Sequence, residues 1–190
     1  MSEARRSQSS GRWFEFRIDI RAPRELVWEL LQDTQLRPSW DERVVSYEPV
    51  DPGPTAKGSR FHLRFRLFGV PSMVELQCIT WDPPHRSAVR AVRFGRGSLF
   101  LSQAGSWQLV SKPDGVTEWV SRIQMRAKGP PPLARALERI TGDYLGALAL
   151  KSQEKLRAIA EARWRARVAG PHVASRSSES IAPQARVYES

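Results

Sequence analysis

The sequence of 190 residues is poor in the side chains that bind metal ions or form disulfides. Its single cysteine, Cys78, excludes an internal disulfide, and its three histidines do not cluster with that cysteine. We therefore expect no metal site and no cofactor. Because free cysteine is among the residue types most often buried, we predict that Cys78 is a small core side chain.

Long hydrophobic runs are also missing. No apolar run approaches the roughly 20 residues that cross a bilayer, and the polar segment 2–12 lacks the apolar centre of a secretory signal. We therefore expect a cytoplasmic protein. With 41% hydrophobic residues, the chain is long enough for one domain with a substantial core and short for two.

Negative charge is scarce relative to positive charge. Thirty Lys and Arg residues against twenty Asp and Glu residues give a formal net charge of +10, which raises the question of a nucleic-acid or membrane partner. The cations are scattered along the expected strands and become dense only over residues 157–167, and no known nucleic-acid-binding signature accompanies them. We expect no specific nucleic-acid partner. A weak contact of residues 157–167 with an anionic membrane surface stays open as an alternative.

The most informative segment lies near the start of the chain. Apolar side chains at every second position from Phe14 to Ile20 predict a half-buried strand over 13–20. Pro23 then suits a first helical turn, and the apolar spacing that follows it predicts a helix. Pro38 interrupts that helix, so a second short helical turn should present Trp40.

The middle of the chain alternates strand patterns with turn residues. Gly, Pro and Asp clusters separate six segments with strand character. Consecutive strands with short turns indicate an antiparallel meander, and the first strand brings the sheet to seven. The six predicted strands cover residues 43–50, 59–68, 70–81, 85–94, 98–111 and 116–127.

A long amphipathic helix should follow the proline run 130–132. Its apolar stripe must be buried, and the concave face of the sheet is the only large partner for it. We therefore predict an α+β fold over residues 13–166, in which a seven-stranded curved antiparallel sheet wraps around a long C-terminal helix and two short helices follow the first strand. Residues 1–12 and 167–190 are expected to be disordered tails. The predicted stripe consists of Leu133, Leu137, Ile140, Tyr144, Leu148, Leu156 and Ile159.

This order of elements resembles the helix-grip fold of the START-related (SRPBCC) superfamily. The segment Ile20–Trp28 is similar to the opening of its polyketide cyclase/dehydrase and lipid-transport branch. The resemblance covers residues 13–163 and implies a cavity between the sheet and the long helix. Three further segments agree with the family: Lys57-Gly58-Ser59, Trp81-Asp82-Pro83-Pro84-His85-Arg86 and Asp114-Gly115-Val116-Thr117.

The residues expected to line this cavity follow from the alternation of each strand and from the facing helices. Aromatic side chains on the inner face of a small sheet also form solid core, so that alternative stays open for each of them. An apolar cleft with few polar groups is typical of a small-molecule site. The predicted ligand-binding residues are Trp28, Trp40, Phe61, Leu63, Phe65, Leu76, Cys78, Trp107, Trp119, Ser121, Ile123, Tyr144 and Leu148.

The sequence offers little support for catalysis. Aromatase/cyclase members of the family place an arginine, a tyrosine and a hydroxyl side chain in the pocket, and no clear match to that set is found here. Val44 stands where an aromatic hydroxyl would be expected. Arg37 and Asp41, at the cavity mouth, are candidates for binding the polar ends of a ligand, but we expect them to be solvated charges at a helix end. His62 and His85 are expected to lie outside the cavity. We therefore predict no catalytic residues.

Two functional hypotheses follow. The first is the binding or transport of a hydrophobic small molecule, such as a lipid, a polyketide or an isoprenoid-like compound. The alternative is a polyketide cyclase or dehydratase that works mainly by folding its substrate, because proximity alone can lower a reaction barrier substantially.

Overall fold

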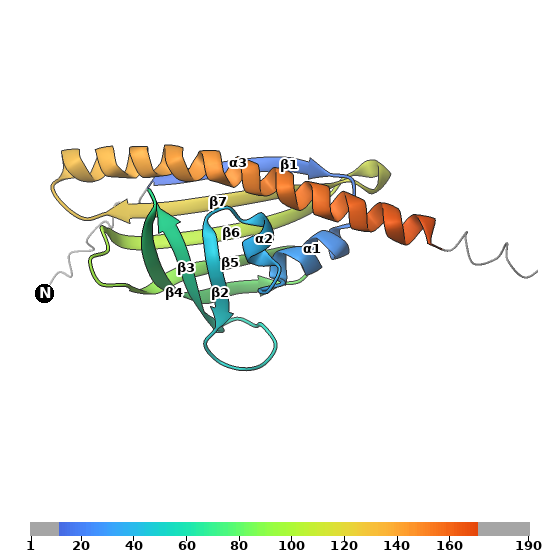
Figure 1. Cartoon of the computed structure of the whole chain (residues 1–190), viewed down its shortest axis with the longest axis horizontal. Helices are drawn as coiled ribbons and strands as arrows, with labels where there is room; N and C mark the ends of the chain where they lie inside the picture. Colours follow the sequence, from blue (N-terminus) through green and yellow to red (C-terminus); the bar gives the residue numbers. More distant parts are fainter. Residues whose placement is uncertain (1–11, 171–190) are drawn as a thin grey trace, which may run out of the picture.

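The computed structural model describes residues 12–170, which form a curved antiparallel sheet and a long helix (Figure 1). This architecture is the predicted α+β helix-grip fold. The elements, in chain order, are β1 (Arg12–Ile20), α1 (Arg24–Gln32), α2 (Arg37–Trp40), β2 (Val44–Pro49), β3 (Arg60–Leu67), β4 (Val70–Asp82), β5 (Arg86–Phe94), β6 (Phe100–Ser111), the short 3₁₀ turn η1 (Pro113–Gly115), β7 (Thr117–Ala127) and α3 (Pro131–Ala169).

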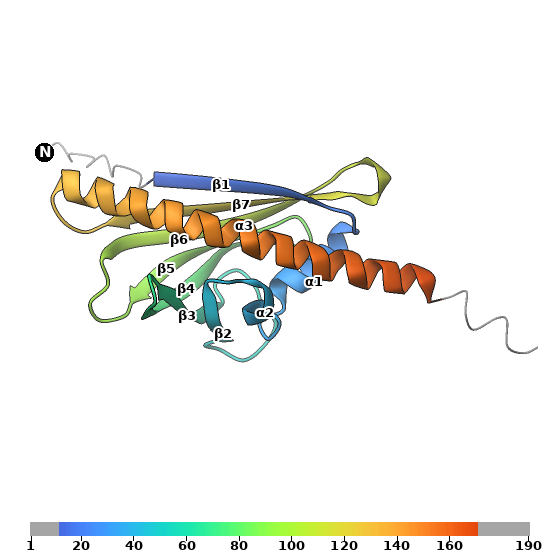
Figure 2. The same cartoon turned by 45° about the horizontal axis from the view of Figure 1, so that its top comes forward.

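The sheet is a meander whose first strand returns to pair with the last. Its strand order is β1-β7-β6-β5-β4-β3-β2, and every neighbouring pair is antiparallel. The connection through α1 and α2 therefore carries the chain from one edge of the sheet to the other. Helix α3 runs along the trough beside β1 and β7 (Figure 2). No helix within residues 12–170 is both long and apolar enough to span a bilayer.

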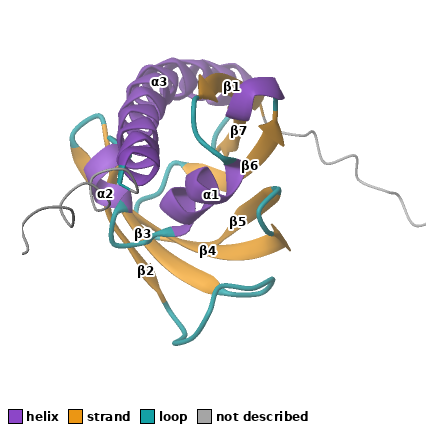
Figure 3. Ribbon diagram, turned by 90° about the vertical axis from the view of Figure 1, so that its right-hand side faces the viewer, coloured by secondary structure: helices purple, strands orange, loops and turns teal. Residues whose placement is uncertain are grey.

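The trough arises because the sheet bends sharply in its middle. Pairing between β5 and β6 covers only Arg86–Arg90 against Ala104–Gln108, whereas β6 and β7 are paired along almost their whole length. The two parts of the sheet diverge beyond this short seam. In the end-on view, α1 lies within the curve of the sheet, and α3 covers the side of the sheet that β1 forms (Figure 3).

The core is densest where the three helices meet the sheet. Pro23 precedes α1, and the side chains of Leu26, Val27, Leu30 and Leu31 are buried. The helix ends at Asp33, whose Oδ1 accepts the backbone N–H groups of the next turn. This local hydrogen bonding stabilises the break that the sequence predicts before α2. The fully buried Trp40, Trp119 and Leu156 join α2, β7 and α3 in one cluster.

The buried face of α3 differs from the predicted stripe. Leu133 and Ile140 are 64% and 58% exposed. Small residues occupy much of the buried face because the helix lies close to β1: a Cβ atom at Gly142 would stand 1.9 Å from Cζ of Phe14. The buried residues are Ala134, Thr141, Gly142, Leu145, Gly146, Ala149, Ser152, Gln153, Leu156 and Ala160.

The last helix is also longer than the sequence pattern suggests. It continues to Ala169, so residues 167–169, which we expected in the C-terminal tail, are helical. Arg12, expected in the N-terminal tail, begins β1. The rest of both predicted tails, 1–11 and 171–190, lies outside the described residues.

Candidate ligand-binding cavity

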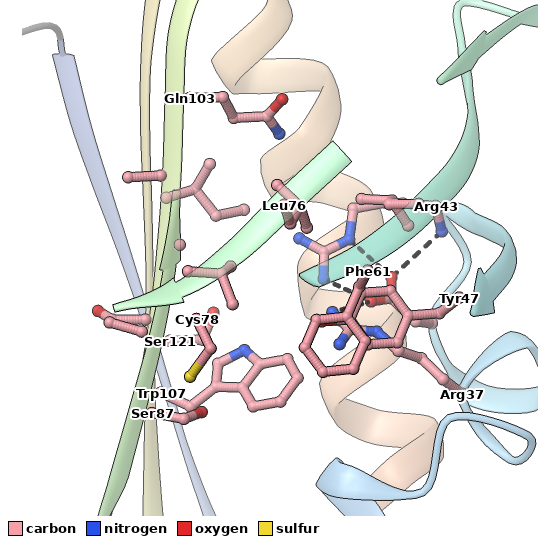
Figure 4. Close-up of a pocket in the computed structure, with 18 of the residues that line it drawn as sticks. Arg37, Arg43, Tyr47, Phe61, Leu76, Cys78, Ser87, Gln103, Trp107 and Ser121 are labelled. Carbon is pink, nitrogen blue, oxygen red and sulfur yellow. Dashed lines mark hydrogen bonds and ion pairs between the residues drawn. The ribbon is translucent and has the colours of Figure 1, made fainter. Parts of the chain in front are cut away.

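A cavity of about 110 Å³ lies in the trough of the sheet. Strands β2 to β7 supply most of its wall, α1 and α2 contribute at one end, and Leu145 comes from α3. The structure brings eight of the predicted residues, from β3, β4, β6 and β7, together around this space (Figure 4). Those residues are Phe61, Leu63, Phe65, Leu76, Cys78, Trp107, Ser121 and Ile123.

The other predicted tryptophans lie in the core and not in the cavity wall. Trp28 packs on Trp81 with ring centroids 5.2 Å apart, and Trp40 packs on Trp119 at 5.9 Å. Strand alternation correctly predicts that Trp119 points inward. The three helices cover that end of the sheet, however, so Trp119 is part of the core. Trp107 contacts both Trp40 and Trp119, so its ring separates the core from the cavity.

Tyr144 and Leu148 also lie away from the cavity wall. The Tyr144 ring packs against Phe68, in the turn between β3 and β4, with centroids 4.5 Å apart. Leu148 is half-buried on the same helix. Leu145 faces the cavity because the close contact of α3 with β1 rotates the helix relative to the predicted stripe.

Asp41 is buried and its partners Arg37 and Arg43 are largely buried, which corrects the expectation that Arg37 and Asp41 are solvated. The side chain of Asp41 is 1% exposed, and those of Arg37 and Arg43 are 11% and 15% exposed. The Asp41 carboxylate accepts hydrogen bonds from Nε and Nη2 of Arg43 at 2.7 and 2.9 Å. It accepts Nη2 of Arg37 at a longer 3.5 Å.

The Arg37 guanidinium lies against aromatic rings at one end of the cavity. Its central carbon is 4.4 Å from the ring centroid of Tyr47 and 4.5 Å from that of Trp107. Such cation–π contacts partly replace the water that a buried guanidinium loses. The uncharged Gln103 lies far from Arg37 among the lining side chains drawn in Figure 4. The end of the cavity beside α2 is therefore cationic.

Burial and neighbouring charges set the protonation of this cluster. Burial lowers the pKa of the Arg37 guanidinium, against the opposing charge of Asp41. Burial also raises the pKa of the Asp41 carboxyl, but the charges of Arg43 and Arg37 outweigh it and leave that pKa below its usual value. Asp41 is thus a bound counter-ion and a poor base.

Tyr47 is a cavity residue that the sequence pattern missed. Its ring stacks on Phe61 with centroids 4.8 Å apart, and burial raises its pKa to about 12. The hydroxyl is therefore neutral and able to donate. The family resemblance places an aromatic hydroxyl at Val44, but a register shift between Val44 and Ser46 changes the alternation of β2. Both Val44 and Tyr47 consequently point inward and are buried.

The cavity lacks an evident proton-transfer group. Among residues 12–170, those lining it include no histidine, and Asp41 is their only carboxylate. Burial raises the pKa of the Cys78 thiol, whose Sγ donates to the Thr80 carbonyl at 3.2 Å. His85 is exposed and hydrogen-bonds with Arg24. No group of three potential metal ligands occurs in the described part of the chain.

The curved sheet, the long helix and the cavity between them define a helix-grip protein of the START-related class. Residues 13–161 match the family described as polyketide cyclase/dehydrase and lipid transport. The chain belongs to this family. No curated protein matches the sequence.

Solved structures with the same fold are distant in sequence. The Zhui aromatase/cyclase from Streptomyces sp. R1128 has a TM-score of 0.68 and 19% identity over 82% of this chain and 97% of its own. A START superfamily protein from Mycobacterium smegmatis has a TM-score of 0.61 and 13% identity over 82% and 98%. The di-domain ARO/CYC StfQ of the steffimycin biosynthetic pathway has a TM-score of 0.64 and 14% identity over 80% and 51%. These similarities establish the fold.

Proposed function

We propose that the protein binds one hydrophobic small molecule in this cavity and acts as a binding or carrier module. The observation that carries the proposal is an interior space of about 110 Å³ with largely apolar walls, including Phe61, Leu76 and Ile123. Protein interiors are normally packed as closely as organic crystals, so a solid core would not leave a cavity of this size in the trough of the sheet. Apolar cavities with a few polar groups are typical small-molecule sites.

The size of the cavity limits what it holds. An engineered cavity of about 150 Å³ in another protein holds a benzene ring. The present space therefore suits one ring or a short branched segment, and the rest of a larger lipid, polyketide or isoprenoid would extend through the mouth. The family description, which includes lipid transport, supports this class of ligand.

The second candidate is a polyketide cyclase or dehydratase. Arg37 and Tyr47 in the cavity favour it, because a guanidinium and a neutral phenol are donors that stabilise an enolate. The similarity to an aromatase/cyclase fold agrees with it. The lining offers no available base, so the chemistry would rest on substrate folding. Incubation with a linear poly-β-ketone tests this: faster cyclisation that Tyr47→Phe reduces supports it, and a rate equal to that without protein contradicts it.

A matched pair of substitutions on β6 tests binding in the cavity. Gly105 lies two residues from Trp107 and shares its inward face, and a Cβ there meets only ordinary contacts with Arg122 and Val89. Gly105→Leu should therefore fill the cavity. Gln108→Leu is the control, because Gln108 is exposed on β6, does not line the cavity, and points to the face opposite Trp107.

The measurement is the thermal shift produced by cinnamamide and by a panel of fatty acids, isoprenoid quinones and aromatic polyketides. A ligand at 100 times its dissociation constant stabilises a protein by about 2.7 kcal/mol. We expect a shift for the unaltered chain and for Gln108→Leu, and none for Gly105→Leu. Equal shifts in both variants, or no shift with any compound, would contradict the proposal.

A further inference from the structure

The lining of the cavity carries more positive than negative charge. Within residues 12–170, the charged side chains that line it are Arg37, Asp41, Arg43 and Arg122. The side chain of Arg122 is 45% exposed and pairs with Glu15 of β1, so solvent screens its charge and it lies outside the buried cluster around α2. Two buried guanidinium groups then share one carboxylate. The cluster is left with one positive charge.

The carboxylate is mainly committed to Arg43. Two of its hydrogen bonds, at 2.7 and 2.9 Å, come from that guanidinium in a bidentate arrangement, and Arg37 has only the 3.5 Å contact. Bidentate arginine–carboxylate pairs are among the strongest protein hydrogen bonds. Arg37 is therefore the undersatisfied cation of the cluster.

One N–H donor of Arg37 lacks an acceptor within residues 12–170. The aromatic rings of Tyr47 and Trp107 contact its guanidinium, but a ring face accepts no conventional hydrogen bond. Nε of Arg37 is buried and has no hydrogen-bond partner within residues 12–170. Gln32 of α1 also lines the cavity, and its Nε2 is buried without a partner in the same part of the chain. Buried donors without acceptors are costly unless something fills them.

The other titratable groups near Arg37 supply no second anion. Besides Asp41 and Arg43, the group acting on its charge is Tyr47, whose pKa of about 12 keeps it neutral. Cys78 elsewhere in the wall is also a neutral thiol, since burial raises its pKa. An external anion would therefore complete the charge balance.

We propose that the ligand is a hydrophobic acid, whose carboxylate binds the Arg37 guanidinium while its apolar body lies along Phe61 and Trp107. This inference rests on the proposed function and names the ligand class for the same cavity. Arginine presents its N–H groups in a planar fork that matches the two carboxylate oxygens. The stacked rings hold that fork in one orientation, so little side-chain entropy is lost when the acid binds.

The experiment compares cinnamate with cinnamamide at pH 7. These two molecules share size and shape and differ in charge. Affinities are measured from the indole N–H resonance of Trp107 in NMR titrations of the full chain. A charge-assisted hydrogen bond supports an affinity ratio of about 10- to 100-fold in favour of the acid. In Arg37→Gln, which leaves the Asp41–Arg43 pair in place, we expect the affinity for cinnamate to fall more than the affinity for cinnamamide, so that the ratio approaches one.

The outcomes separate this inference from the proposed function. Equal binding of acid and amide by the unaltered chain, or an acid preference that survives in Arg37→Gln, would overturn the hydrophobic-acid ligand and leave the cavity as a general apolar site. Failure of both probes and of the wider panel to bind would overturn the proposed function and this inference with it. The comparison on the unaltered chain needs no variant, so the test stands even if Arg37→Gln does not fold.

Discussion

Gly142 of α3 lies directly over the ring of Phe14 on β1. A Cβ atom at Gly142 would approach three ring atoms of Phe14 at 1.9, 2.3 and 2.6 Å. No packed side chain tolerates such distances, so the absence of a side chain at this position sets how closely the long helix approaches the sheet. That approach in turn decides which helix residues face the cavity.

Gly142→Ala should therefore destabilise the protein by about 1–3 kcal/mol, the usual cost of overpacking. The helix propensity gained by replacing glycine, about 1 kcal/mol, offsets only part of a larger steric cost. Gly146→Ala is the matched control, because its added Cβ would meet the Phe16 ring at 3.2 and 3.3 Å, which a small shift relieves. Urea denaturation measures both. Equal stability of the two variants would contradict the close-packing account.

Asp41→Asn should be strongly destabilising. It removes the one negative charge that the buried Arg37 and Arg43 share. Breaking a buried ion pair by removing one partner costs about 3–5 kcal/mol. Asp82→Asn is the control: its pair with Arg86 is largely exposed, and such pairs contribute about 0–1 kcal/mol. Chemical denaturation of both variants checks the difference, and similar losses would show that the cluster is not electrostatically important.

Asp41 should also contribute to acid sensitivity. Its pKa is lowered in the folded protein, since the charges of Arg43 and Arg37 outweigh the opposing effect of burial. An unfolded aspartate titrates at about 3.9, so as the pH falls the unfolded chain takes up this proton first and unfolding becomes more favourable. The contribution is complete above the unfolded pKa and is lost as the pH falls through the folded one. NMR titration of the Asp41 carboxyl carbon should show protonation below about pH 4; protonation at higher pH would refute this.

Tyr47 should govern stability at alkaline pH. Burial raises its pKa to about 12, so between about pH 10 and that value the unfolded chain ionises and the folded chain does not. Its contribution is complete below about pH 10 and is lost as the pH rises. Tyr47→Phe should remove the last step of the tyrosinate absorbance titration and reduce the alkaline loss of stability. Tyr144→Phe, which keeps Tyr47, should retain that step; its disappearance there would contradict the assignment.

Much of the fold follows from local patterns. Strand alternation and the Gly, Pro and Asp turns predict seven strands, and the structure contains them in the expected order. The same alternation places Phe61, Leu76 and Ile123 on the inner face, where they line the cavity. Alternation is reliable here because adjacent residues in a strand must point to opposite faces.

The polar end of the cavity was harder to predict. Tyr47 faces inward because a bulge near Val44 changes the phase of β2, and a bulge is not visible as a sequence period. Arg37 is buried because α2 is enclosed by its neighbours, although a charged residue beside a proline reads as exposed. The small residues on α3 do not stand out in a pattern of large apolar side chains, yet they make up most of the buried residues of the helix.

The sequence alone determined the elements of this protein, the antiparallel meander of its last six strands and the apolar character of the inner face, because those depend on side-chain periodicity and turn chemistry within short segments. The rotation of α3, the boundary between core and cavity at Trp107, and the burial of Arg37 with Asp41 and Arg43 depended on the tertiary structure. They arise from segments far apart in the chain covering one another, and burial of that kind is a property of the assembled layers.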